Sequence, residues 1–214
     1  MASTTPAASG TDVEPVLSDV QRRLLVAAER LFAERGVANV SLREIGAGAQ
    51  QRNHSAVQYH FKTKAALIQA LYDFRLIPLN RRRLEMLAAR DEHTFEQLVE
   101  AYIRPLGDAV VATGGGNSYA RFVHRYLGEG AGDFEPFGDR HNSGVKTIVE
   151  ELLVRLADLD ESHRDERIQQ FKRLVTSVLA DVERRLEHHQ ITGEQAATAV
   201  DTLIVGAAAY LRAS

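Results

Sequence analysis

Hydrophobic residues recur every three to four positions along most of this chain, which is the spacing of an α-helix with one buried face. The first clear stripe predicts a helix over residues 19–35, ended by Gly36 and capped at its start by Ser18 or Asp19. Its apolar positions are Val20, Leu24, Leu25, Ala28, Leu31 and Phe32. No stretch alternates apolar and polar residues for more than a few positions, so the pattern predicts an all-α fold.

Two shorter helices are expected next. Ser41, with a glutamate three residues later, has the spacing of a capping box and predicts the start of the second helix. Residues 50–52 then form a turn, and Asn53 can cap a third helix that buries Val57 and Phe61. The two helices therefore lie around a tight polar turn.

From Thr63 onward, one helical stripe follows another to the end of the chain. Pro78 lies inside the first of these stripes, and because proline lacks an N–H, we expect it to kink or break that helix. Pro105 lies late in the next stripe. Two long stripes end the chain, and the second begins at Thr192 with Gln195 as its capping partner.

Charge is distributed unevenly along the sequence, although the net charge is only −3. Residues 1–18 carry −2, residues 19–64 carry +4, and residues 65–214 carry −5. A basic N-terminal part on an acidic body favours a polyanionic partner at one end of the molecule.

Composition excludes several classes of protein. The chain has no cysteine, so disulfides and thiolate metal sites are excluded and a reducing cytoplasm is compatible. No apolar run approaches the ~18 residues of a membrane span, and the N-terminus lacks the pattern of a secretory signal. Residues 1–18 are rich in Ser, Thr, Ala, Gly and Pro, which predicts a disordered arm. We therefore expect a cytoplasmic protein without a membrane partner.

The outward face of the third predicted helix carries hydrogen-bonding side chains and almost no aliphatic ones. These side chains are Asn53, His54, Ser55, Gln58, Tyr59 and His60, and the cations around them are Arg43, Arg52, Lys62 and Lys64. Such a helix suits the major groove of DNA better than a catalytic pocket. The segment therefore predicts a DNA-binding regulator.

The order of these elements resembles the TetR family of bacterial transcriptional regulators. The residues that carry the resemblance are Ala28, Leu31, Phe32, Gly36, Ser41, Leu42, Arg43, Ile45, Ala49, His60, Phe61, Lys64 and Leu67. It covers about residues 20–70. The turn at residues 50–53 is one residue longer than the Gly-Val-Ser common in that family, and Gln58 stands where a tyrosine is common.

The resemblance implies a helix-turn-helix over residues 19–65, followed by a ligand-binding and dimerisation domain over residues 66–214. In a helix-turn-helix the second helix contacts base edges with its N-terminal half. That half would hold Asn53, His54, Ser55 and Gln58, while phosphate contacts would come from Ser41, Arg43, Arg52, Tyr59, His60, Lys62 and Lys64. Alternatively, Ser41 and Asn53 are only caps, Arg43 and Lys62 are solvated, and His60 packs under Phe61.

The resemblance also implies a homodimer that represses genes from a palindromic operator and is released by a small-molecule inducer. The last two helices are the candidate dimer surface, unless their stripes are simply core within one chain. The candidate ligand-binding residues are Tyr102, Phe122, His124, Tyr126, Phe134 and Phe137. The alternative for these aromatic residues is ordinary core packing.

Enzymes are the first competing class. The chain lacks His-Glu-x-x-His and Gly-x-Ser-x-Gly, and the adjacent His188 and His189 point too far apart on a helix to share a metal ion. A di-iron helical bundle needs Glu-x-x-His pairs, a spacing that is absent here. We expect no catalytic residues, metal or cofactor. The second competing class is a helical adaptor that binds protein through residues 81–83.

Overall fold

The structure is a computed structural model that describes residues 16–51, 55–128 and 141–213. The described residues fold into nine α-helices and contain no strand, which confirms the predicted all-α class. The helices are α1 (Asp19–Arg35), α2 (Leu42–Gly48), α3 (Ala56–Phe61), α4 (Lys64–Ala88), α5 (Phe95–Ala112), α6 (Tyr119–Gly128), α7 (Ser143–Arg155), α8 (Glu161–Glu187) and α9 (Gly193–Arg212).

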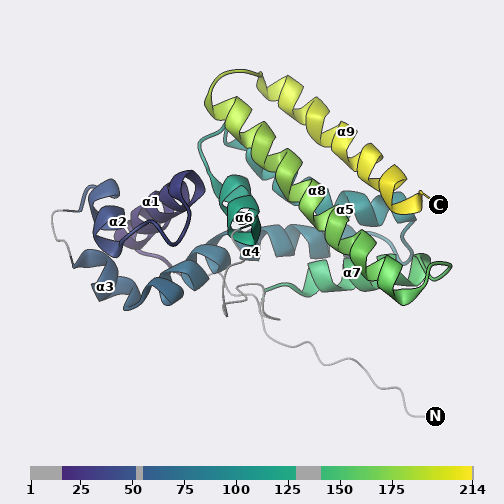
Figure 1. The fold of residues 1–214 in the computed structure, drawn as a ribbon, viewed down its shortest axis with the longest axis horizontal. Helices are drawn as coiled ribbons and strands as arrows, with labels where there is room; N and C mark the ends of the chain where they lie inside the picture. Colours follow the sequence, from purple (N-terminus) through teal and green to yellow (C-terminus); the bar gives the residue numbers. More distant parts are fainter. Residues whose placement is uncertain (1–15, 52–54, 129–140, 214) are drawn as a thin grey trace, which may run out of the picture.

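The helices form two lobes joined through α4. Figure 1 shows α1–α3 gathered at one end, with α4 running from there into the larger lobe. Helices α8 and α9 lie side by side along the outer edge of that lobe, and α6 stands between α1 and α8. Helix α6 therefore contacts both the small lobe and the long C-terminal helices.

Helix α1 begins and ends as its sequence predicts. Ser18 accepts the backbone N–H of Gln21 at the start, and Gly36 ends the helix with a φ of 81° while its N–H donates to Phe32 O. Of the expected arm, residues 1–15 lie outside the described residues, whereas Leu17 already packs against the core.

Helix α2 ends in a Schellman motif that has glutamine where glycine is usual. Gln50 has a φ of 56° and donates its N–H to Ala47 O, and the next N–H, of Gln51, donates to Gly46 O. The sequence indicated a turn here, but the left-handed residue is a glutamine, so the glycine signal for a helix end is missing.

The two internal prolines do not end their helices. Pro78 lies inside the 25 residues of α4, and Pro105 lies inside the 18 residues of α5. Of the kink or break expected at Pro78, the break is therefore wrong, because packing on both sides of the missing hydrogen bond holds the helix together. The continuous α4 reaches from the small lobe across the larger one.

The stripes of α8 and α9 are buried within the chain itself. Phe171, Val175 and Leu179 of α8 and Val200 and Ala207 of α9 are all in the core. Helices α5 and α9 approach so closely that a Cβ at Gly107 would lie 2.6 Å from Val200 Cγ1. Any dimer surface on these helices must use their opposite, outward faces.

The three consecutive arginines 81–83 do not share one face. Arg81 and Arg82 are exposed, whereas Arg83 is buried. Successive helical residues point about 100° apart, so a run of three cannot form one adaptor surface. A protein-binding surface at this run would therefore use Arg81 and Arg82 without Arg83.

Candidate nucleic-acid interface

Helix α3 is anchored by its apolar residues and presents its polar ones. Ala56, Val57 and Phe61 are buried against the neighbouring helices, while Gln58 and Tyr59 are exposed. This division follows helical periodicity, since positions 57 and 61 are one turn apart. The result is a short helix that is held by its buried apolar residues and exposes hydrogen-bonding side chains to solvent.

The start of α3 differs from the sequence-based expectation. The N-cap residue is Ser55, and its side chain makes no capping hydrogen bond. Asn53, expected to cap the helix, lies outside the described residues together with Arg52 and His54. The described part of the candidate base-reading face is therefore Ser55 and Gln58.

Aromatic and basic groups follow one another along this face. Tyr59 is 72% exposed, and the half-buried His60 ring meets it edge-on at 5.1 Å between centroids. Lys62 Nζ donates to Tyr59 O at 3.0 Å and lies 5.4 Å from the centre of the Tyr59 ring. The His60 ring also lies 6.4 Å from that of Phe61, so it is only partly packed beneath it.

The junction between α3 and α4 is short and strained. Only Lys62 and Thr63 separate the two helices. Lys62 has φ 65° and ψ −54°, and Thr63 N–H donates to Phe61 O at 2.7 Å, which is a γ-turn of the rarer hand. Thr63 then caps α4 by accepting Ala66 N–H. This two-residue turn therefore sets the angle between α3 and α4.

The expected phosphate contacts separate into outward and inward side chains. Arg43 is exposed and makes no hydrogen bond or ion pair within the described part of the chain. Lys64 instead turns inward, where its ammonium donates to Val37 O and lies over the Phe32 ring. Burial lowers the pKa of Lys64. The lysine therefore ties the loop after α1 to α4.

Ser41 is occupied by its capping box. Its hydroxyl accepts Glu44 N–H, and the Glu44 carboxylate accepts the backbone N–H of Ser41 and an N–H of Arg35. These hydrogen bonds, with that from the Ser41 backbone foremost, lower the pKa of Glu44 to about 2. Ser41 and Arg43 at the start of α2 are exposed, so this end of the helix faces solvent.

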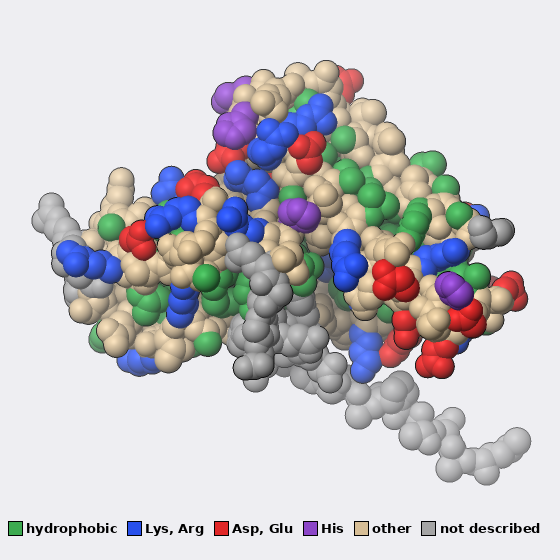
Figure 2. All heavy atoms as spheres, in the orientation of Figure 1, with side chains coloured by type: hydrophobic (Ala, Val, Ile, Leu, Met, Phe, Trp, Pro, Cys, Tyr) green, Lys and Arg blue, Asp and Glu red, His purple; other side chains and the backbone are tan. Residues whose placement is uncertain are grey.

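The surface charge follows the two lobes. Figure 2 shows Lys and Arg distributed over the lobe of α1–α3, whereas Asp and Glu gather at the opposite end of this face. That end holds the start of α8, where the sequence carries Asp158, Asp160, Glu161, Asp165 and Glu166. An approaching polyanion is attracted to the small lobe and repelled from the far end.

The expected ligand-binding residues do not form one site. Phe122 and Tyr126 join Tyr72 in a buried aromatic cluster, with ring centroids of Tyr72 and Phe122 5.3 Å apart. Tyr102 packs instead on Phe171, at 4.8 Å. Phe134 and Phe137 lie outside the described residues.

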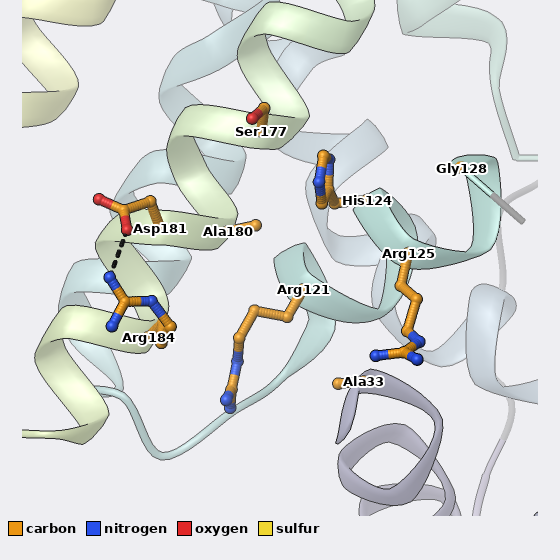
Figure 3. A pocket seen from close by; sticks show the side chains of 9 residues that line it. All are labelled: Ala33, Arg121, His124, Arg125, Gly128, Ser177, Ala180, Asp181 and Arg184. Atoms are coloured by element: carbon orange, nitrogen blue, oxygen red, sulfur yellow. Dashed lines mark hydrogen bonds and ion pairs between the residues drawn. The ribbon is translucent and has the colours of Figure 1, made fainter. Parts of the chain in front are cut away.

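His124 faces a different part of the molecule. It is exposed and lines a surface pocket between α1, α6 and α8, which Figure 3 shows from close by. Its neighbours Arg121 and Arg125 project from α6, and an Asp181–Arg184 ion pair lies across from them on α8. His124 is thus separated from the aromatic cluster that it was expected to accompany.

A buried ion pair that the sequence analysis missed connects the lobes. Glu29 of α1 is 1% exposed, and its carboxylate accepts Arg75 Nε at 2.6 Å and Nη2 at 3.0 Å. It also accepts the backbone N–H of Ser118, at the start of α6, at 2.8 Å. Glu29 falls one turn after Leu25 on the apolar face of α1, and that position was the available signal.

A second buried carboxylate holds α6 to α8. Glu183 accepts the backbone N–H groups of Ala120 and Arg121 and the Nε of Arg121, at 3.0 to 3.2 Å. Burial raises the pKa of Glu183 to about 7, against the opposing effect of these donors. Its position between Val182 and Leu186 on an apolar stripe was again the only sequence signal.

The described residues hold no group of three His, Asp or Glu side chains placed to bind a metal ion. His189, one of the adjacent histidines, ends α8 with a φ of 53°. None of the described helices has the length and apolar character to cross a bilayer.

Comparison with known proteins agrees with this geometry. Residues 24–71 match the family model described as "Bacterial regulatory proteins, tetR family". No curated protein gives a significant match. Salmonella enterica GusR is a similar solved structure, with 20% identity, a TM-score of 0.48, and coverage of 93% of this chain and 100% of that one.

A second similar structure is NalD, described as the secondary repressor of the MexAB-OprM multidrug efflux pump in Pseudomonas aeruginosa. It has 19% identity, a TM-score of 0.48, and coverage of 87% of this chain and 94% of that one. The matched residues 24–71 comprise most of α1, all of α2 and α3, and the start of α4. The helix-turn-helix part of this chain therefore matches the tetR family of bacterial regulatory proteins.

Proposed function

We propose that this protein is a cytoplasmic repressor that binds a palindromic DNA operator as a homodimer and leaves it when a small molecule binds the larger lobe. The observation that carries the proposal is the exposed polar face of α3, at Gln58 and Tyr59, on a helix anchored by Val57 and Phe61. The boundaries proposed for the two domains are residues 19–65 and 66–214.

The chemistry of this face suits the edges and backbone of duplex DNA. Gln58 can bond adenine through two hydrogen bonds, and Ser55 can serve several bases. Phosphate contacts would come from Arg43, Lys62 and the start of α2. Lys64 is left out of this set because its ammonium turns inward, to Val37 O and the face of the Phe32 ring.

A homodimer would use the outward face of α9 and its neighbour α8. Val205 on α9 is 71% exposed, and a Cβ added at the adjacent Gly206 would meet nothing within 4 Å. Small residues allow helices to approach closely, so a second copy could cover this face. Twofold symmetry would then place the two α3 helices about 34–36 Å apart, one turn of DNA.

Ligand control would act through the tie between α1 and α6. Because Glu29 holds both Arg75 and Ser118 N–H, a shift of α6 or α4 changes the position of α1. A ligand releases DNA only if it binds the DNA-incompetent arrangement more tightly. The Glu29 contacts supply a physical connection between the two arrangements.

Selection of bound sequences from random duplex DNA tests the proposal. We expect a palindrome, with half-site centres about one helical turn apart, and a log–log salt slope of about −4 to −8. The absence of an enriched sequence, together with a flat salt response, would contradict it.

Two variants and a control locate the interface. Gln58→Ala should relax preference at one position of each half-site and cost about 1–3 kcal/mol of discrimination, whereas Lys62→Ala should weaken binding to all sequences and reduce the salt slope. The control is Arg90→Ala, which removes an exposed charge just after the end of α4 and should leave the affinity unchanged. Equal effects of all three variants would place the interface elsewhere.

A further inference from the structure

The surface pocket between α1, α6 and α8 touches both lobes. It has a volume of about 580 Å³, which falls within the range of roughly 300–1,000 Å³ that small-molecule sites occupy in proteins. Ala33 comes from the last turn of α1, and the other described lining residues come from α6 and α8 (Figure 3). A molecule in this pocket would therefore contact the small lobe and the large lobe at once.

The lining follows one face of α6 and one face of α8. Arg121, His124 and Arg125 lie three and four residues apart on α6, and the α8 lining from Ser177 to Arg184 recurs at the same spacing. Residues at these spacings lie on the same side of a helix. The pocket is thus bounded by two helix faces, and its side chains come from regular structure.

Short side chains leave room inside the pocket. Ala33, Gly128, Ser177 and Ala180 contribute little side-chain volume to the lining. Among the described lining residues there is no large aliphatic side chain, and the one ring is the exposed imidazole of His124. A site for an apolar molecule would need hydrophobic and aromatic walls. This lining instead suits a small polar molecule.

Positive charge dominates the lining. Arg121, Arg125 and Arg184 bring three guanidinium groups, against the one carboxylate of Asp181. Figure 3 shows Arg121 and Arg125 projecting from α6, with Ala33 between their guanidinium ends. Figure 2 shows Lys, Arg and His side chains gathered over α6 and the C-terminal end of α8. An anion is therefore attracted to this part of the surface.

Arg121 is held in place by groups outside the lining. Its Nε pairs with Glu183 at 3.2 Å, its Nη1 pairs with Glu187, and its Nη2 donates to Ser118 Oγ at 2.9 Å. Each Nη carries a second hydrogen that these contacts do not use. Because burial raises the pKa of Glu183 to about 7, this carboxyl compensates the arginine only in part near neutral pH.

The other cations of the lining are accessible to a ligand. Arg184 pairs with Asp181 at 2.6 Å, but both side chains are about half exposed, so solvent weakens the pair to about 1 kcal/mol or less. Arg125 Nη1 donates to Glu34 O, at the end of α1, at 3.2 Å. His124 is exposed, and its imidazole can donate an N–H in either tautomer. A stronger acceptor can therefore engage Arg184 and His124 at small cost.

We propose that this pocket binds a small phosphorylated sugar, with the phosphate between Arg121, Arg125 and Arg184 and the sugar over the short side chains. The planar guanidinium matches phosphate oxygens through paired hydrogen bonds. A phosphate monoester carries close to two negative charges and three acceptor oxygens, so it can engage several guanidinium groups together. A carboxylate has one charge and two oxygens and satisfies fewer of them.

This inference deepens the proposed function and rests on it only where DNA is concerned. Arg125 already reaches the end of α1 through Glu34 O, and Ala33 lies in the same turn. A phosphate held between these residues and α8 therefore fixes the position of α1 against the large lobe. We expect the bound sugar phosphate to reduce operator affinity, as the proposed effector does.

Paired probes test the site. Thermal unfolding of the full chain is followed at constant ionic strength with ribose 5-phosphate and glucose 6-phosphate, with ribose and glucose, and with inorganic phosphate. We expect at least one sugar phosphate to raise Tm as its concentration increases, the free sugars to leave Tm unchanged, and inorganic phosphate to bind about tenfold more weakly than that sugar phosphate. If neither sugar phosphate raises Tm more than its free sugar does, or if inorganic phosphate binds as tightly, the proposal is overturned.

A carboxylate placed inside the pocket assigns the effect to it. Ser177 is exposed and makes no hydrogen bond within the described part of the chain, so Ser177→Glu leaves the ion pairs intact. It should weaken sugar phosphate binding at least about tenfold by like-charge repulsion. Ser162→Glu is the matched control, because it adds the same charge at the opposite end of α8. Equal binding by the two variants would overturn the proposal.

Removal of one cation gives a second, independent measure. Arg184→Gln should weaken sugar phosphate binding about tenfold, as expected for the loss of a charge-assisted hydrogen bond. Asp181 keeps Arg185 as a partner, at 3.7 Å, so this exposed change should not unfold the protein. Unchanged affinity in Arg184→Gln would remove this arginine from the site and contradict the arrangement proposed for the phosphate.

Operator binding in the same samples separates this site from the proposed function. A sugar phosphate that binds a protein without DNA affinity would refute the regulator and keep the site. DNA binding with no response of Tm to any sugar phosphate would refute the site and keep the regulator. We expect both activities, with the response of DNA affinity to the sugar phosphate lost in Ser177→Glu and kept in Ser162→Glu.

Discussion

Glu29 and Arg83 are both buried charged side chains, but they differ in how completely hydrogen bonds and ion pairs compensate their charge. Glu29 has a guanidinium and a backbone N–H, and its three hydrogen bonds join α1, α4 and α6. Arg83 has one neutral carbonyl and an N–H group without an acceptor. A fully partnered buried charge holds neighbouring helices together, whereas a partly partnered one carries a desolvation cost that its contacts do not offset.

The largest expected effect concerns the satisfied charge. Glu29→Ala leaves Arg75 without its carboxylate and Ser118 N–H without an acceptor, so it should destabilise the fold by roughly 3–5 kcal/mol. Denaturant unfolding measures this loss. Glu34→Ala, which removes an exposed acid of the same helix, should change the free energy of unfolding by less than about 0.5 kcal/mol. Equal losses of stability in Glu29→Ala and Glu34→Ala would contradict a structural role for the Glu29 contacts.

Glu183 offers an intermediate case, in which the partners are present but burial still dominates. Its pKa rises from 4.5 to about 7 on folding, so the folded protein binds more protons than the unfolded chain between these values. The free energy of unfolding should therefore fall as pH rises through this window, on the order of 3 kcal/mol. Glu183→Gln should flatten that slope in denaturant unfolding followed across the window, and an unchanged slope would contradict the raised pKa.

Removing the charge of Arg83 should not lower the free energy of unfolding as removing that of Glu29 does. Arg83→Met keeps much of the side-chain volume and removes an uncompensated buried cation, so the ligand-free protein should change by less than about 1 kcal/mol or become more stable. The measurement is the same denaturant titration used for Glu29→Ala. A loss as large as that of Glu29→Ala would show that Arg83 is structural.

The smallest effect is expected at the phenol. Because the Tyr119 hydroxyl makes no hydrogen bond, Tyr119→Phe should alter ligand-free stability by less than about 0.5 kcal/mol. Together with Arg83→Met, this variant tests whether buried groups that lack hydrogen-bond partners contribute little to the stability of the fold. Destabilisation by 2 kcal/mol or more (roughly the cost of losing a made hydrogen bond) would contradict it.

Local signals predicted the helices and several of their ends. Serine and threonine caps fix the starts of α1, α2 and α9, and the apolar stripes fix which faces are buried. The end of α2 was less visible, because Gln50 adopts a conformation that usually needs glycine. The sequence also allowed a break at Pro78, but α4 continues through this residue, because tertiary packing outweighs one missing hydrogen bond.

Side-chain partners could not be predicted in the same way. Lys64 was expected at phosphate, but the loop at Val37 lies within its reach only once α1 and α4 have packed. Arg83 continues the stripe of Tyr72, Leu76 and Leu79, so its burial was visible in the spacing. That it lacks a counterion depends on which helices surround it, and the sequence of one helix does not contain this information.

The tight turn at Lys62 makes α3 and α4 a single rigid piece. Because only Lys62 and Thr63 separate the two helices, a rotation of α4 about its far end rotates α3 through the same angle. Because α4 also carries Arg83 a long way from the turn, a small tilt at that residue is magnified at Tyr59. In the proposed dimer, the length of α4 would therefore influence how far apart the two α3 helices lie.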